Sequence, residues 1–211
     1  MNRRSALLAL AGAAPLAAET RPSEDRIYRF EPQSLTVDDF PAAGLILDLG
    51  GGGEGIIARV KGRQVVAIDL IKRELEEAGG DPLLKVVMDA TDLKFLDGAF
   101  PTVTSFFTLM YVPDARQEQV FREARRVLAP GGRFLVWDLH VPTRIDPARD
   151  LAVCRFEFRL PREVVKTGYG AFFPERPHDL HHYRGLAEAA GFRAAAVRDA
   201  GRTFFLELVA G

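Results

Sequence analysis

The sequence predicts a doubly wound α/β fold, with a mostly parallel sheet that ends in an antiparallel hairpin. Between residues 45 and 139, short runs rich in Val, Ile and Leu alternate with helical patterns. Strands of this composition are typical of a parallel sheet, because helices cover both of its faces. Residues 192–210 then hold two strand patterns around a tight turn, which predicts the closing hairpin.

The elements of the alternating region follow from their composition and boundaries. The clearest helix is expected over 114–129, where apolar residues recur at helical spacing, Asp114 can cap the first turn and Pro130 ends the pattern. Strand patterns occupy 45–49, 65–70, 83–88, 133–139 and part of 102–112, and shorter helical patterns occupy 53–61 and 72–79.

The C-terminal third departs from this alternation. Residues 154–161 alternate between apolar and charged side chains, so we expect a strand with one solvent-exposed face. Its apolar face is expected to cover another part of the molecule. A helix ended by Gly191 is expected after residue 177, and the turn of the final hairpin is expected at 199–201. Glycines and phenylalanines within 166–177 indicate either a mobile apolar flap or an extension of the sheet edge.

Length and charge limit the organisation and the partners. The 211 residues suit one α/β domain, expected over 45–211, after a linker at 19–44 that contains three prolines. The formal net charge is -1, so electrostatic attachment to nucleic acid or to an anionic membrane is not expected. The single cysteine, Cys154, cannot form an internal disulfide. Neither the redox compartment nor the oligomeric state follows from the sequence.

Residues 1–18 have the order of a secretory signal, with Arg3 and Arg4 ahead of an apolar run that is too short to span a bilayer comfortably. The arginine pair also resembles a twin-arginine export signal. An apolar helix that packs on the domain is the alternative interpretation.

Four consecutive glycines at 50–53 separate the first strand from the helix that follows it. Gly50, Gly52 and Gly55 match the spacing G-x-G-x-x-G, and Asp69 follows at the end of the next strand. The pattern fits two ligands. One is a nicotinamide dinucleotide, with its diphosphate on the helix N-terminus, and the other is S-adenosylmethionine, which has a ribose but no phosphate.

Two carboxylates favour the second ligand. Asp48 precedes the glycines at the end of the strand, where it would repel a diphosphate but suit an ammonium group and a sulfonium. Asp89 follows the third strand, where it could accept a hydrogen bond from an adenine amino group while the amide of Ala90 meets a ring nitrogen. The segment APGGRFLV and the final hairpin are not expected in a dinucleotide-binding fold.

Four segments, LDLGGGGEG, VVAIDL, MDATDLKF and VLAPGGRFLVWD, occur in this order and resemble those of the class I S-adenosylmethionine-dependent methyltransferases. The resemblance covers residues 45–139 and extends through the hairpin toward Gly211. It implies a Rossmann-like sheet of seven strands with its last strand antiparallel, S-adenosylmethionine as cofactor, and methyl transfer to a small-molecule acceptor. Residues 150–177 would then wall the acceptor pocket.

The resemblance also implies which residues bind the cofactor. The glycines would approach the methionine part, Asp48 and the carbonyl of Thr108 would meet its ammonium group, and Asp69 would bind the ribose hydroxyls. Asp69 and Asp89 could instead cap the helices that follow them. The full set is Asp48, Gly50, Gly52, Asp69, Leu70, Asp89, Ala90 and Thr108.

Three positions depart from the family pattern. Glu54 stands where the family has a glycine, and Gly51 stands where it often has cysteine, so the loop is expected to bend differently. Pro101 stands where an aspartate commonly precedes the fourth strand.

Methyl transfer requires an aligned acceptor and exclusion of water, and it requires a general base only where the acceptor loses a proton. The candidates for a base are Tyr111, His140 and Tyr169, each of which could instead be a packing or loop residue. Three histidines at 178, 181 and 182 share a helix face, but no carboxylate or cysteine pattern completes a ligand set. We therefore expect exposed histidines at the start of a helix and no metal.

Two other functions remain open at this point. The glycine spacing also fits a nicotinamide-dependent oxidoreductase, and the leader fits an exported, non-enzymatic module that keeps the fold. S-adenosylmethionine is made in the cytoplasm, so an exported methyltransferase would need its donor carried across with it. The location therefore stays open between export, which the leader indicates, and the cytoplasm, which the donor supply favours.

Overall fold

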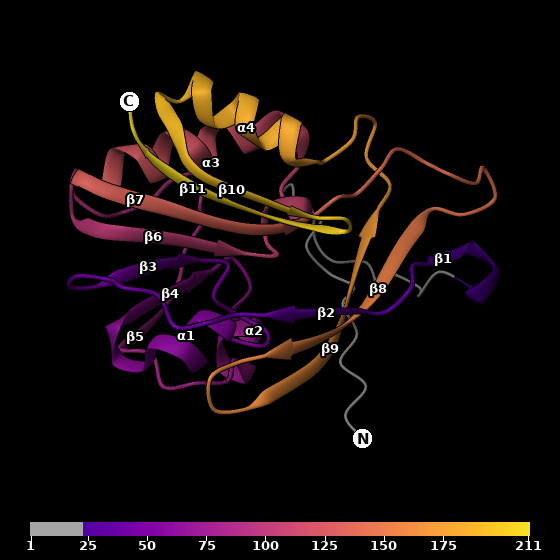
Figure 1. The fold of residues 1–211 in the computed structure, drawn as a ribbon, viewed down its shortest axis with the longest axis horizontal. Coiled ribbons are helices and arrows are strands. Elements are labelled where there is room, and N and C mark those ends of the chain that lie inside the picture. Colours follow the sequence, from indigo (N-terminus) through magenta and orange to yellow (C-terminus); the bar gives the residue numbers. More distant parts are fainter. Residues whose placement is uncertain (1–22) are drawn as a thin grey trace.

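The structure, a computed structural model, describes residues 23–211, so the leader expected over 1–18 lies outside the described residues. A seven-stranded sheet crosses the molecule in the order β10-β11-β7-β6-β3-β4-β5 (Figure 1). Its first five strands in the chain run parallel, and β11 is antiparallel to both neighbours. The predicted doubly wound α/β fold with its closing hairpin is confirmed. The strands are β3 (Ile46–Leu49), β4 (Val65–Asp69), β5 (Leu84–Val87), β6 (Phe100–Phe106), β7 (Leu128–Leu139), β10 (Phe192–Ala200) and β11 (Thr203–Ala210).

Each face of this sheet carries its own layer. Helices α3 (Asp114–Val127) and α4 (Leu180–Ala189) cover one face (Figure 1). Phe121 and Tyr183 are fully buried there. Helices α1 (Ile56–Lys61) and α2 (Lys72–Glu77) lie on the other face together with a second, smaller sheet. Short 3-10 helices occupy Glu24–Arg26, Gly62–Gln64 and Leu109–Tyr111.

The smaller sheet is built around β8 (Leu151–Arg159). Strand β9 (Val164–Phe172) pairs antiparallel with one edge of β8, and β1 (Ile27–Arg29) and β2 (Gln33–Thr36) pair parallel with the other. The predicted alternation is confirmed, because Phe156 and Phe158 are buried against the main sheet while Arg155 is exposed. The ring of Phe158 packs edge-on against Phe106, the last residue of β6, at 5.1 Å between centroids. Aromatic packing therefore holds the small sheet over the carboxyl ends of the parallel strands.

Strands occur in two regions that the sequence predicted as a linker, at 19–44, and as a flap or an edge extension, at 166–177. Residues 27–29 and 33–36, expected within the linker, pair with β8, and Pro32 lies between them where no ladder N–H is required. Residues 164–172, which include most of the expected flap, pair along the whole of β8. These residues therefore form an edge strand of the small sheet.

Three smaller expectations were wrong. Pro113 occupies the cap position of α3, so Asp114 is its first residue and caps nothing. The helix ends at Val127, because Leu128 already belongs to β7. The turn of the final hairpin is Gly201–Arg202, since Ala200 still pairs with Thr203 and the positive φ of 72° falls on Gly201. The predicted stop of α4 at Gly191, with φ of 83°, is confirmed.

Pro101 lies inside β6, which is a central strand of the sheet. The pairing of β6 with β7 shifts in register between Phe100 and Thr102, so the missing N–H of the proline falls at an irregularity of the ladder. No helix within residues 23–211 is long and apolar enough to cross a bilayer.

Replacement of Phe158 by alanine tests the docking of the small sheet. The side chain is fully buried, so Phe158→Ala should lower the free energy of unfolding by about 3 to 5 kcal/mol in chemical denaturation. Val164→Ala, at an exposed position of β9, is the control and should change it by less than about 0.5 kcal/mol. Equal stability of Phe158→Ala and the control would contradict this packing.

Candidate functional site

The glycine run forms a bend between β3 and α1 in which Gly50 and Gly53 have φ of 71° and 58°. A Cβ on Gly50 would overlap the side chain of Thr108, and a Cβ on Gly52 would lie 2.6 Å from Asp69 Oδ2. At Gly51 a Cβ would lie 2.8 Å from Asp48 Oδ2, so the cysteine common in the family does not fit this loop without a shift. Glycine is required here for close approach as well as for backbone conformation.

Four carboxylates surround this bend: Asp48, Asp69, Glu74 and Glu54. Asp48 is buried on β3 and accepts a hydrogen bond from Thr104 Oγ1 at 2.7 Å. Burial raises the pKa of Asp48 to about 7, and the nearby charge of Asp69 adds to the effect while the Thr104 hydroxyl opposes it. Burial also raises the pKa of Glu74, with further contributions from Asp69 and Glu54. These groups thus destabilise one another's charges when nothing positive lies among them.

This concentration of acidic groups separates the two ligands left open by the sequence. A diphosphate at the bend would meet several carboxylates within a few residues, whereas a sulfonium or ammonium group would relieve their repulsion. The electrostatics of the bend therefore favour a cationic ligand.

Asp69 and Leu70 lie side by side at the end of β4. Burial raises the pKa of Asp69, and the amides of Ile71, Gly52 and Leu70 oppose this rise. Its Oδ1 accepts a hydrogen bond from Ile71 N at 2.9 Å. Asp69 thus closes a local turn and does not act as the N-cap of α2, which is Ile71. The neighbouring Leu70 is 47% exposed, so an apolar surface lies beside the Asp69 carboxylate. A nucleoside needs both, because its ribose forms hydrogen bonds and its flat base packs on apolar side chains.

Asp89 and Ala90 lie just beyond β5. Asp89 accepts hydrogen bonds from Thr91 N at 2.9 Å and from Arg116 Nη2 at 2.7 Å. Burial works to raise the pKa of Asp89, but the bonds from Thr91 and Arg116 outweigh it and hold the pKa below its ordinary value. Asp89 therefore organises a turn and an ion pair. Arg116, which the sequence analysis did not single out, shares the carboxylate that was expected to bind adenine.

Thr108 lies where β6 turns into the 3-10 helix Leu109–Tyr111. Its carbonyl accepts a hydrogen bond from Tyr111 N at 3.0 Å, which leaves one lone pair for a ligand. The turn is held by Asp138, a buried residue of β7 whose carboxylate accepts from the amides of Leu109 and Leu139 at 2.9 and 2.8 Å. Asp138 was missed as a site residue, although it ends the quoted segment VLAPGGRFLVWD.

Glu54 connects the glycine bend to the small sheet. Its two carboxylate oxygens accept hydrogen bonds from Thr167 Oγ1 at 2.5 Å and from Tyr169 Oη at 3.0 Å, both on β9. The Tyr169 ring stacks on Phe107 at 5.1 Å, and Phe107 is the one residue other than glycine with positive φ in the described chain. Burial, together with the charge of Glu54, raises the pKa of Tyr169, so its phenol stays protonated.

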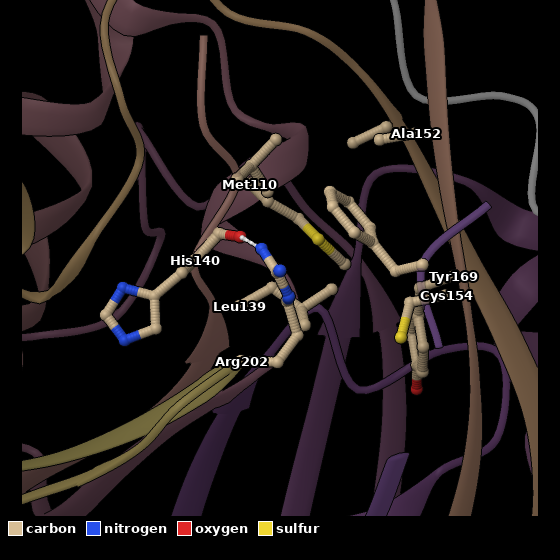
Figure 2. A pocket seen from close by; sticks show the side chains of 10 residues that line it. Met110, Leu139, His140, Ala152, Cys154, Tyr169 and Arg202 are labelled. Carbon is tan, nitrogen blue, oxygen red and sulfur yellow. Dashed lines mark hydrogen bonds between the residues drawn. The ribbon is translucent and has the colours of Figure 1, made fainter. Parts of the chain in front are cut away.

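The three candidate bases differ in where they point. A cavity lies between the small sheet and the ends of β7 and β11, and the ring of Tyr169 forms part of its wall (Figure 2). The imidazole of His140 turns away from this cavity and bonds Asp199 at 3.1 Å. Tyr111 ends the 3-10 helix that follows β6, where burial and the charge of Asp138 raise the pKa of its phenol. Of the three, Tyr169 alone both lines the cavity and contacts the glycine bend.

The histidines near α4 were expected to be exposed, and for His178 this is wrong. His178 is buried between helices, where its Nε2 lies 2.6 Å from Asp114 Oδ1, and His182 bonds Gln117 at 2.6 Å. Asp114 thus pairs with a histidine instead of capping its helix. Within residues 23–211, no group of three or more His, Cys, Asp or Glu side chains is arranged to hold a metal ion.

A family model described as a methyltransferase domain matches residues 47–136, which run from β3 through the bend to β7. Over these residues the chain matches a methyltransferase domain. The acidic bend and the glycines that leave no room for a side chain fit S-adenosylmethionine, the cofactor that the sequence resemblance implies.

The chain is also similar to curated methyltransferases in sequence and to solved structures in fold. A sarcosine/dimethylglycine N-methyltransferase of Halorhodospira halochloris is 35% identical over 135 residues, which cover 59% of this chain and 46% of that protein. A demethylmenaquinone methyltransferase of Clavibacter sepedonicus is 39% identical over 110 residues, 48% of this chain and 44% of the relative. The chain thus spans less than half of the length of these relatives. An S-adenosylmethionine-dependent methyltransferase from Mesorhizobium loti shares the fold, with a TM-score of 0.55 and 21% identity over 80% of this chain and 93% of that one.

The buried carboxylate of Asp48 makes the stability of the methyltransferase domain depend on pH. Its pKa is raised from the ordinary 3.8 to about 7, so folding favours the protonated form, and this stabilisation is lost as the pH rises through about 7. In the unaltered protein, titration of Asp48 should lower the free energy of unfolding by about 1.4 kcal/mol for each pH unit between about pH 4 and 7. Asp48→Asn cannot titrate, so this part of the decrease should be absent from the variant. Asp138, whose pKa is likewise raised to about 7, should keep its own contribution.

Chemical denaturation over a series of pH values measures this slope. Asp39→Asn is the control, because Asp39 is an exposed carboxylate paired with Lys61. The slope of the control should match that of the unaltered protein in the same range. An unchanged slope in Asp48→Asn would contradict the buried, protonated state.

Proposed function

We propose that the protein transfers the methyl group of S-adenosylmethionine to a small-molecule acceptor that binds under the small sheet. The observation that carries this proposal is the ring of Asp48, Asp69, Glu74 and Glu54 around a glycine bend, with a cavity next to it. A cationic donor would sit among the carboxylates, and an acceptor would enter between the small sheet and the ends of β7 and β11.

The residues of the bend would hold the donor by its charged and polar ends. Asp48 and the carbonyl of Thr108 would face its ammonium group, and Asp69 would accept from the ribose hydroxyls beside Leu70. The N–H of Ala90, which donates to no residue in the described part of the chain, would meet the adenine, with Asp89 next to it. When bound, S-adenosylmethionine supplies a methyl group on a positively charged sulfur, which is already activated for displacement.

Tyr169 and Glu54 would align the acceptor. The Tyr169 ring walls the cavity and its hydroxyl donates to Glu54, so this one residue spans the distance between acceptor and donor sites. Buried aromatic residues of the small sheet exclude water from the space between them, which is the main contribution an enzyme makes to a displacement of this kind. The relatives named above act on amines or on a quinone precursor, so they support a small acceptor without specifying its reacting atom.

Replacement of Asp69 tests the donor site. Asp69→Asn keeps an oxygen for the Ile71 amide but removes the charge that would bind the ribose, so the Kd for S-adenosylmethionine should rise by about 10- to 100-fold. Isothermal titration measures it. Glu76→Gln on the exposed side of α2 is the control and should bind as the unaltered protein does. Failure of the unaltered protein to bind S-adenosylmethionine would overturn the proposal.

Replacement of Glu54 tests whether the carboxylates recognise the positive sulfur. S-adenosylhomocysteine has the same groups but a neutral sulfur, so it serves as the matched ligand. Glu54→Gln should weaken binding of S-adenosylmethionine about fivefold more than binding of S-adenosylhomocysteine, a change on the order of 1 kcal/mol for one partly solvated charge pair. Glu157→Gln, on the wet face of β8, should weaken neither. An equal loss for both ligands would restrict Glu54 to a structural role.

A further inference from the structure

The cavity beside Tyr169 has an uneven distribution of charge. Its walls are mostly apolar, with Met110, Leu139, Ala152 and Cys154 among them (Figure 2). No aspartate or glutamate lines it, and its one permanent cation is Arg202. The unfilled space is about 250 Å³, including the opening to solvent.

Arg202 occupies the two-residue turn between β10 and β11. Its guanidinium lies over the ring of Phe30 at 4.0 Å, and Nη1 donates a long hydrogen bond of 3.4 Å to the carbonyl of His140. Within residues 23–211, no carboxylate forms an ion pair with Arg202, whereas Arg26, Arg116 and Arg133 each have one. Most of its N–H donors therefore have no partner in the described chain.

The charge of Arg202 reaches into the cavity. Burial raises the pKa of the Cys154 thiol to about 11, and the Arg202 cation opposes this rise. A guanidinium beside apolar walls interacts strongly with an anion, because little water competes and its planar fork matches two carboxylate oxygens at once.

The two ends of the proposed active site thus have opposite charge. Carboxylates surround the donor at the glycine bend, and a lone arginine stands on the acceptor side. An acceptor with a negative group would be repelled by the bend and attracted by Arg202, so its other end would point toward Tyr169 and the donor. The same arrangement would leave a neutral acceptor without orientation.

We propose that the acceptor carries a carboxylate and that Arg202 is the residue that selects and orients it. This proposal rests on the proposed function for the reaction, but the binding of a carboxylate at Arg202 is measured without any reaction. Arg202 contacts the acceptor only through its anionic end and takes no part in the transfer itself.

The test uses pairs of small probes that differ in charge: acetate with acetamide, and benzoate with benzamide. Binding is measured by ligand-observed NMR on the protein saturated with S-adenosylhomocysteine. At least one acid should bind the unaltered protein, its amide should bind at least tenfold more weakly, and Arg202→Met should weaken the acid at least tenfold, as loss of charge-assisted bonds predicts. Arg202→Lys keeps the positive charge but loses the planar guanidinium, so its affinity for the acid should lie between those of the unaltered protein and Arg202→Met.

Arg198→Met is the matched control, because Arg198 also lies over an aromatic ring, Phe205, at 4.3 Å in the same hairpin but outside the cavity. It should bind the acids as the unaltered protein does. The proposal is overturned if no acid binds, if the amides bind equally well, or if Arg202→Met and Arg198→Met behave alike.

Titration with S-adenosylmethionine separates this proposal from the previous one. Arg202→Met should bind S-adenosylmethionine with an unchanged Kd, which also shows that the variant is folded. If S-adenosylmethionine binds and the acids do not, the acceptor assignment alone fails. If the unaltered protein binds no S-adenosylmethionine, the methyltransferase proposal fails whatever the acids do.

Discussion

The gathering of carboxylates around a bend of glycines is the constraint on which the site depends. Anionic groups lose solvation when they are buried and repel one another at short range, so such a cluster is stable only with protons or a cation in place. In the protein without a ligand, burial and the nearby charge of Asp69 raise the pKa of Asp48. A ligand with a positive sulfur and an ammonium group removes this repulsion, and a diphosphate increases it. The electrostatics at the bend therefore favour the proposed donor over a dinucleotide.

The small sheet connects this bend to the acceptor side. Glu54 is both the last polar residue of the glycine loop and the acceptor for two hydroxyls of β9, and β9 in turn carries Tyr169 into the cavity wall. A glycine at position 54, as the family pattern has, would make neither bond. This departure from the family pattern thus provides the contact that connects the glycine loop to the small sheet.

Local patterns predicted most of the fold. Alternating strands and helices, the closing hairpin and the wet face of β8 all follow from hydrophobic periodicity, which depends on neighbours in the sequence. The strands at 27–29 and 33–36 could not be predicted in this way, because they exist only through pairing with β8, more than a hundred residues later. The contacts of Arg116 and Asp138 and the Glu54–Tyr169 bond were missed for the same reason, since each depends on a partner that is distant in the sequence.

Competition for the glycine bend tests the central claim most directly. Radiolabelled S-adenosylmethionine would be bound to the purified protein, and unlabelled S-adenosylhomocysteine or NAD⁺ would be added in increasing amounts. A site built from carboxylates predicts that S-adenosylhomocysteine displaces the label and that NAD⁺ leaves it in place even in large excess. Displacement by NAD⁺, or no retention of S-adenosylmethionine at all, would contradict a cation-binding bend.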